Sequence, residues 1–309
     1  MNSRFLMKDS TTMLPYLLRA SVCLCILVAS QGVNAADSTA RTIVMPRPVA
    51  SFGAAVSGNW LYVYGGHHGR AHDHSKDTIS AAFYRMSLAH PGTVELLPHR
   101  SLTQGASLLA HEGKIIRVGG MTARNTRDEE DDLYSLRDCE VFDPLTRAWS
   151  ALPDLPEGRS SHDSGIIDNV LYVIGGWKLA GEERPVWARD VWALDLGDTA
   201  SGWKTIATIP SERRAIDVTV LEKQLYVLGG ITKDRKLSKE ASRLDPATGE
   251  WTTMPDLPSH GFGISATVIG DTLWASGMDG QLLSLTDQDW KVHRGLVAPR
   301  FFHRMEPVS

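Results

Sequence analysis

The chain has 309 residues, of which 42% are hydrophobic and 22% charged, so it is long enough to bury a sizeable core. Its 32 Lys and Arg residues against 36 Asp and Glu give a formal net charge of −4. That balance argues against a nucleic-acid partner, for which a basic surface is expected.

Residues 1–35 are predicted to be a secretory signal peptide. Arg4, Lys8 and Arg19 precede an apolar run over residues 20–29, and Ala35 ends a stretch suited to cleavage. The alternative is a membrane anchor, but the run is shorter than the ~20 residues that span a bilayer. Cleavage would change the net charge from −4 to −6 and leave Cys139 as the single cysteine. We therefore expect a secreted or periplasmic protein without a membrane span or an intramolecular disulfide.

A short apolar stretch ending in Gly-Gly then recurs along the chain. The copies end in Gly65-Gly66, Gly119-Gly120, Gly175-Gly176 and Gly229-Gly230, and a degenerate copy ends in Gly277-Met278. Steps of 54, 56, 54 and 48 residues separate the first glycines, a period typical of radially repeated folds. Each unit also carries a turn rich in proline, and most carry a tryptophan before that turn: Trp149, Trp203, Trp251 and Trp290.

This pattern resembles the kelch repeat over nearly all of residues 41–309. The resemblance implies an all-β fold, a kelch-type β-propeller with five recognisable four-stranded blades plus an incomplete sixth. Residues 36–309 are accordingly predicted to form one propeller domain. Strands a to d of each unit are expected to run from the centre outward, with Gly-Gly at the end of strand b.

The two ends of the repeat region leave the number of blades open. Residues 300–303 look like the opening of a sixth unit, and residues 42–46 look like an outer strand with its turn. Either the design has six blades with a defective last one, or a five-bladed ring carries an extra strand. The first reading is favoured because the second leaves an open sheet edge unexplained.

Antiparallel order places the b–c and d–a connections on the same face of a propeller. The b–c loops of units one to three are long, over residues 67–80, 121–136 and 177–189, and long loops often carry function. This face is predicted to bind the ligand, and Trp177 and Trp187 within it are suited to stacking on a sugar or a peptide.

The d–a junctions on that face repeat a basic residue. The candidates for ligand binding there are Arg47, Arg100, Arg159, Arg213 and Arg300, with His162 and Asp163 added because the other units do not repeat them. A ring of guanidinium groups could bind a carboxylate through paired hydrogen bonds. The alternative is a scaffold in which each arginine ties its own turn to the neighbouring blade by binding backbone carbonyl groups.

Four of the eleven histidines, His67, His68, His72 and His74, lie within eight residues next to Asp73. Imidazoles with a carboxylate suit zinc, copper or nickel, so this segment is a candidate metal site. A solvated polar loop and a pH-sensitive contact are the alternatives. The acidic run at residues 128–132 lacks the spacing of a calcium loop.

No common enzyme motif occurs in the sequence, and no catalytic residue or cofactor is assigned. The favoured function is a binding module for carbohydrate or protein on the loop face. The alternative is a sugar-acid mutarotase similar to N-acetylneuraminate epimerase, also a kelch propeller. In that case Arg159, Arg213 or Arg300 would hold the carboxylate and His162 or a nearby carboxylate would move the proton.

Overall fold

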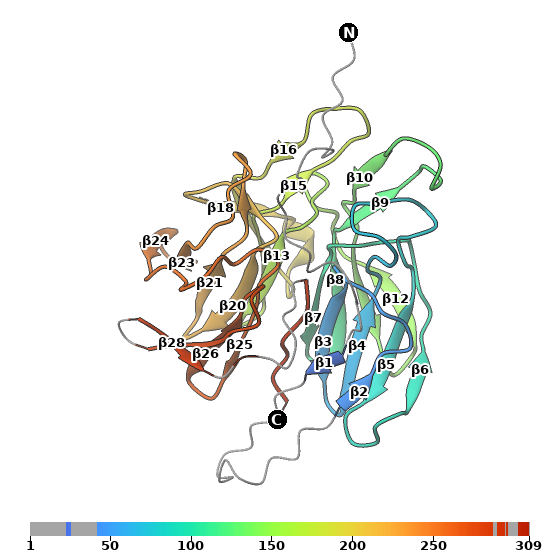
Figure 1. The fold of residues 1–309 in the computed structure, drawn as a ribbon, viewed down its shortest axis with the longest axis horizontal. Coiled ribbons are helices and arrows are strands. Elements are labelled where there is room, and N and C mark those ends of the chain that lie inside the picture. Colours follow the sequence, from blue (N-terminus) through green and yellow to red (C-terminus); the bar gives the residue numbers. More distant parts are fainter. Residues whose placement is uncertain (1–22, 26–41, 287–288, 294, 296–301, 309) are drawn as a thin grey trace.

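The computed structural model describes residues 23–25, 42–286, 289–293, 295 and 302–308. Apart from one 3-10 turn, η1 (Thr199–Ser201), the regular elements in these ranges are β-strands. Five four-stranded antiparallel sheets, the blades, follow one another along the chain and around the molecule (Figure 1). The predicted all-β propeller with five four-stranded blades is confirmed.

Every blade is built from strands in simple chain order, and the short strands in the b–c loops belong to separate two-stranded sheets. Blade one is β3 (Gly53–Ser57), β4 (Trp60–Tyr64), β5 (Phe83–Ser87), β6 (Val94–Leu96); blade two is β7 (Ser107–His111), β8 (Lys114–Val118), β11 (Cys139–Asp143), β12 (Ala148–Ala151). Blade three is β13 (Asp163–Ile167), β14 (Val170–Ile174), β17 (Asp190–Asp195), β18 (Lys204–Thr208). Blade four is β20 (Asp217–Leu221), β21 (Gln224–Leu228), β23 (Ala241–Asp245), β24 (Glu250–Thr253); blade five is β25 (Ser265–Ile269), β26 (Thr272–Ser276), β27 (Leu282–Leu285), β28 (Trp290–His293).

The remaining strands form two-stranded sheets. These are β9 (Met121–Ala123) with β10 (Leu133–Ser135), β15 (Trp177–Lys178) with β16 (Val186–Trp187), β19 (Arg213–Arg214) with β22 (Ile231–Thr232), and β1 (Cys23–Cys25) with β2 (Thr42–Val44).

The b-strands are mostly apolar because both of their faces are buried between blades, and Arg117 on β8 is an exception with a carboxylate partner. On β14, Leu171 and Val173 pack against β8 of blade two. The alternate residues Tyr172 and Ile174 pack against β20 and β21 of blade four. The two-residue period of a strand thus sends successive side chains to opposite neighbours, so no position in the repeat can be polar without cost.

The Gly-Gly pairs join each blade to the next. The second glycine of each pair donates its backbone N–H, at 2.8 Å, to a carbonyl of the following d–a junction. For Gly120 that acceptor is Arg159 O. The first glycine has a positive φ, 54° at Gly119, and a Cβ there would lie 2.5 Å from the same carbonyl oxygen. Any side chain would therefore break the contact between blades.

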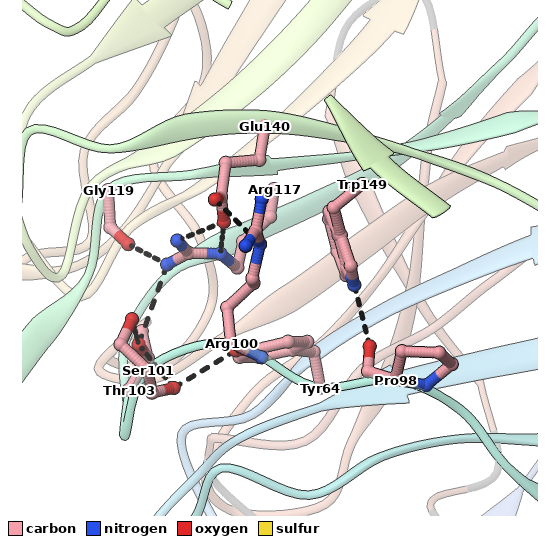
Figure 2. A network of polar contacts seen from close by, with 9 residues as sticks. All are labelled: Tyr64, Pro98, Arg100, Ser101, Thr103, Arg117, Gly119, Glu140 and Trp149. Carbon is pink, nitrogen blue, oxygen red and sulfur yellow. Dashed lines mark hydrogen bonds and ion pairs between the residues drawn. The ribbon is translucent and has the colours of Figure 1, made fainter. Parts of the chain in front are cut away.

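The repeated tryptophan and the repeated proline turn also connect neighbouring blades. The indole N–H of Trp149 donates to Pro98 O at 2.6 Å (Figure 2). Trp203 donates to Pro153 O and Trp290 to Pro255 O, each at 2.9 Å. In each case the outer strand of one blade bonds the turn that closes an earlier one.

Around the centre, backbone hydrogen bonds form a closed ring of six members. Each N–H donates to the carbonyl of the preceding unit at distances between 2.7 and 3.4 Å. The members are Ser51, Gly105, Ser161, Ala215, Gly263 and Phe302, all with φ between 51° and 61°. We call this the backbone ring. Phe302 completes it between blades five and one, at the place of a sixth inner strand.

The sixth position has an inner segment but no four-stranded sheet among the residues described. Residues 302–306 lie where the sequence predicted an inner strand, whereas Arg300 and Phe301 lie outside the described residues. The expected outer strand, β2, pairs with β1 instead. β1 falls within the predicted signal peptide, so cleavage after Ala35 would remove that pairing.

Candidate functional site

The three long b–c loops form one structured platform. We call residues 67–80, 121–136 and 177–189 the loop platform; its hairpins β9–β10 and β15–β16 lie together at the top of Figure 1. Beneath it is a small core that takes residues from all three loops, among them Ile79, Leu133 and Leu179. Backbone bonds connect the loops, from Lys76 N to Asn125 O at 3.0 Å and from Gly181 N to Leu133 O at 2.9 Å. The platform is therefore held in place by its own packing, which reduces the entropy lost on binding.

Two tryptophans and an arginine lie together at the platform. Trp177 and Trp187 are cross-strand partners on β15 and β16, with ring centroids 5.8 Å apart. The guanidinium carbon of Arg214, from β19, lies 4.0 Å from the centroid of Trp177 and 5.9 Å from that of Trp187. Both indoles are half-buried. Both tryptophans lie on the predicted loop face, whereas Arg214 was not among the predicted site residues.

The histidine segment has one buried end and an exposed middle, with His67 buried and His72 exposed. His67 is buried and its Nε2 lies 2.9 Å from Asp73 O, while its backbone pairs with Ala50. The ring centroids of His67 and His74 are 5.0 Å apart, and those of His72 and His74 are 6.2 Å apart. Burial, with His67 and His72 nearby, lowers the pKa of His74 to about 4. His74 is therefore neutral at pH 7.

These positions do not support the four-histidine metal site. In the part of the chain that the structure describes, no three His, Cys, Asp or Glu side chains are grouped to hold a metal ion. The physical reason is that His68 turns away, with Nδ1 3.3 Å from Arg47 Nη2, while His67 uses Nε2 on a backbone carbonyl.

Arg159 and Arg213 are buried and bind the scaffold. Arg159 Nη1 donates to Asp190 O at 2.8 Å, and its guanidinium carbon lies 3.5 Å from the centroid of Trp192. Arg213 donates to Gly229 O and Glu240 O and forms an ion pair with the Glu240 carboxylate. Both side chains are at most 1% exposed, which matches the scaffold alternative for the arginine ring.

In blade two, an arginine of the b-strand and one of the preceding junction share a carboxylate (Figure 2). Arg117, on β8, lies 2.6 Å from Glu140 Oε2 and also donates to Gly119 O. Arg100, a predicted ligand-binding residue, forms an ion pair with the same carboxylate at 3.1 Å. Figure 2 shows both guanidinium groups directed at the Glu140 carboxylate. Arg47 is exposed and contacts His68, and Arg300 lies outside the described residues.

His162 and Asp163 lie inside the propeller. His162 is 3% exposed, and a Cβ on Gly119 or Gly176 would lie within 3.0 Å of its side-chain atoms. Burial, with Arg159 and Arg304, lowers the pKa of His162 to about 3, so it is neutral at pH 7. Since it is enclosed by two glycine turns, a proton-shuttling role for it has no support in this geometry.

Asp163 belongs to a cluster at the mouth of the central channel. The first residues of the inner strands meet there: Gly53, Ser107, Asp163, Asp217 and Ser265. Arg304, in the corresponding place of the sixth position, lies 3.2 Å from Asp163 Oδ2 and 3.5 Å from Asp217 Oδ2. Ser107 and Val218 N also donate to Asp163. Burial and Asp163 raise the pKa of Asp217, while Arg304 opposes the shift.

No helix in the part of the chain that the structure describes is long and apolar enough to cross a membrane.

Parts of this chain are similar in sequence to proteins of known description. Kelch-like protein 35 of Mus musculus is 31% identical over 152 residues, which cover 49% of this chain and 23% of that protein. N-acetylneuraminate epimerase of Haemophilus influenzae (strain PittEE) is 31% identical over 131 residues, covering 40% of this chain and 32% of the enzyme. The match thus spans about a third or less of the length of these two relatives.

A solved structure described as "Structure of YjhT" has the same fold. The two superpose with a TM-score of 0.68 at 14% identity, over 85% of this chain and 89% of the other. A family model, the KLHDC2/KLHL20/DRC7 Kelch-repeats domain, matches residues 52–277. With the glycine pairs, the tryptophan–proline bonds and the blades in place, this chain belongs to the KLHDC2/KLHL20/DRC7 Kelch-repeats domain family.

Proposed function

We propose that this chain is an exported binding module that takes a carbohydrate or protein ligand on the loop platform. The observation that carries the proposal is the small core under the platform, which fixes three loops and the Trp177–Trp187 pair before any ligand arrives. Half-buried indoles offer large apolar area at low entropic cost, a property of residues that dominate binding interfaces. Export rests on the predicted signal peptide, and sequencing the N-terminus of secreted protein tests cleavage after Ala35.

The binding proposal is tested by probing the purified protein against immobilised glycan and peptide arrays. We expect a ligand whose signal falls in Trp187→Ala and is unchanged in Leu145→Ser. Leu145 is 95% exposed in the β11–β12 turn, on the opposite face from the platform, so this variant is a matched surface control. A ligand equally sensitive to both substitutions, or insensitive to Trp187→Ala, would move the binding site off the platform.

A sugar-acid mutarotase is the second candidate, favoured by the 31% identity to N-acetylneuraminate epimerase over 131 residues. The geometry does not favour Arg159 or Arg213 as carboxylate-binding residues or His162 as the proton shuttle, because all three side chains are buried in the scaffold. NMR exchange between the anomers of N-acetylneuraminate tests it. A rate equal to that of buffer alone would exclude this activity.

A further inference from the structure

Arg214 is a half-buried cation without a counter-charge among the described residues. Arg117 and Arg213 have carboxylate partners, and Arg159 donates to a carbonyl. Arg214 has neither an ion pair nor a side-chain hydrogen bond among the residues described, and its Nε is buried without an acceptor. Its guanidinium only stacks on Trp177 and Trp187.

Two neighbours of Arg214, Trp177 and His72, describe its surroundings. The indole N–H of Trp177 is also buried and has no acceptor among the described residues. His72, exposed on the platform, is close enough that Arg214 helps to lower its pKa, after burial, which is the larger cause. Burial lowers the pKa of Arg214 itself to about 10. A half-buried cation without a counter-charge is costly, and an anion at the two Nη groups of Arg214, which are not buried, would supply one.

We propose that Arg214, stacked on Trp177 and next to the exposed His72, binds the carboxylate of an otherwise uncharged ligand on the loop platform. This inference deepens the proposed binding function and rests on it. A guanidinium is suited to a carboxylate because its planar N–H groups can donate two parallel bonds. A single anion is favoured over an acidic polymer because the acidic run at residues 128–132 belongs to the same platform and repels further negative charge.

A thermal-shift titration with sodium glucuronate, at constant ionic strength, tests this assignment. Glucose is the matched neutral probe, since it has the same ring without the carboxylate, and hexaglutamate is the polyanionic probe. We expect glucuronate to raise the melting temperature of the wild-type protein and glucose to leave it unchanged. Arg214→Gln should weaken the apparent affinity for glucuronate by roughly tenfold or more. Arg184→Gln, which removes an exposed arginine of the same platform, should not weaken it.

Two readouts separate ligand binding from folding. Arg214→Gln breaks no ion pair or hydrogen bond among the described residues and removes only the stacking on Trp177 and Trp187, so the free variant should still fold and melt within a few degrees of the wild-type temperature. In wild-type protein, glucuronate should raise the pKa of His72, followed by NMR, because it neutralises Arg214. The other groups that act on His72 are His67 and Asp131, with the His74 ring nearby.

Equal responses to glucuronate and glucose, or a glucuronate response retained in Arg214→Gln, would overturn the assignment. A stronger response to hexaglutamate than to glucuronate would replace the single carboxylate with an acidic peptide. If an array ligand depends on Trp187 but is uncharged and insensitive to Arg214→Gln, the platform function stands and the Arg214 assignment fails.

Discussion

Arg304 neutralises two carboxylates across the channel mouth. Asp163 and Asp217 are 8% and 4% exposed, so neither can be solvated when the arginine is lost. Arg304→Met should therefore lower the free energy of unfolding at pH 7 by about 3 kcal/mol, the cost of breaking a buried ion pair. Urea denaturation measures it, and Asp217→Asn in the same chain should recover part of the loss. An unchanged midpoint would show that Arg304 is not the counter-charge.

Glu306 makes stability depend on pH. Burial, together with Asp217 and Asp163, raises its pKa to about 8, although Arg304 acts in the opposite direction. The folded state then binds more protons than the unfolded state between about pH 4.5 and pH 8, so stability should fall as pH rises through that window. Glu306→Gln should flatten this part of the profile, measured as urea midpoints from pH 5 to pH 8. A parallel profile in the variant would contradict the raised pKa.

At the scale of single elements, the outer-strand tryptophans offer a matched comparison. Trp203 donates its indole N–H to Pro153 O at 2.9 Å, whereas the indole nitrogen of Trp251 is buried without an acceptor among the described residues. Phenylalanine keeps an aromatic ring and removes the donor. We expect Trp203→Phe to cost about 1 kcal/mol more than Trp251→Phe in urea denaturation, because only the first leaves a carbonyl unpaired. Equal losses would assign the role of both tryptophans to packing alone.

The repeat predicted the elements well because each of its residues acts locally or on the next blade. The apolar run packs against two neighbouring blades, and Gly119 lies against the carbonyl of Arg159, so both features recur at fixed spacing.

The candidate site was harder to predict from the sequence than the fold. Arg213 and Arg214 are adjacent in sequence, yet one is paired and the other is not. Strand alternation sends them to opposite sides, and only three-dimensional neighbours decide which one is free. The ion pairs of Arg304 could not be predicted from the sequence because Asp163 and Asp217 are 141 and 87 residues away from it.

Across the whole molecule, the charged groups at the start of the inner strands form ion pairs, whereas Arg214 on the loop platform forms none among the described residues. Carboxylates and arginines at the channel mouth satisfy one another and close the propeller. On the platform, Arg214 and Trp177 keep unused donors above a rigid base of apolar side chains. Arg304, Asp163 and Asp217 thus pair with one another in the scaffold, whereas Arg214 on the platform has no ion pair among the described residues.

Closure of the backbone ring by Phe302 gives the last prediction. Ending the chain after residue 301 would remove the bonds of Phe302 to Gly263 and Ser51 and would leave Asp163 and Asp217 without Arg304. We expect a lower melting temperature and a less cooperative transition, because blades five and one lose their junction. A synthetic peptide of residues 302–309 added to the truncated protein should restore the melting temperature in a concentration-dependent way, since it binds only the folded state. The same peptide with Arg304→Gln should restore it less. If the truncated protein melts like the full chain, the five blades close without the sixth position and the backbone ring is not what holds them.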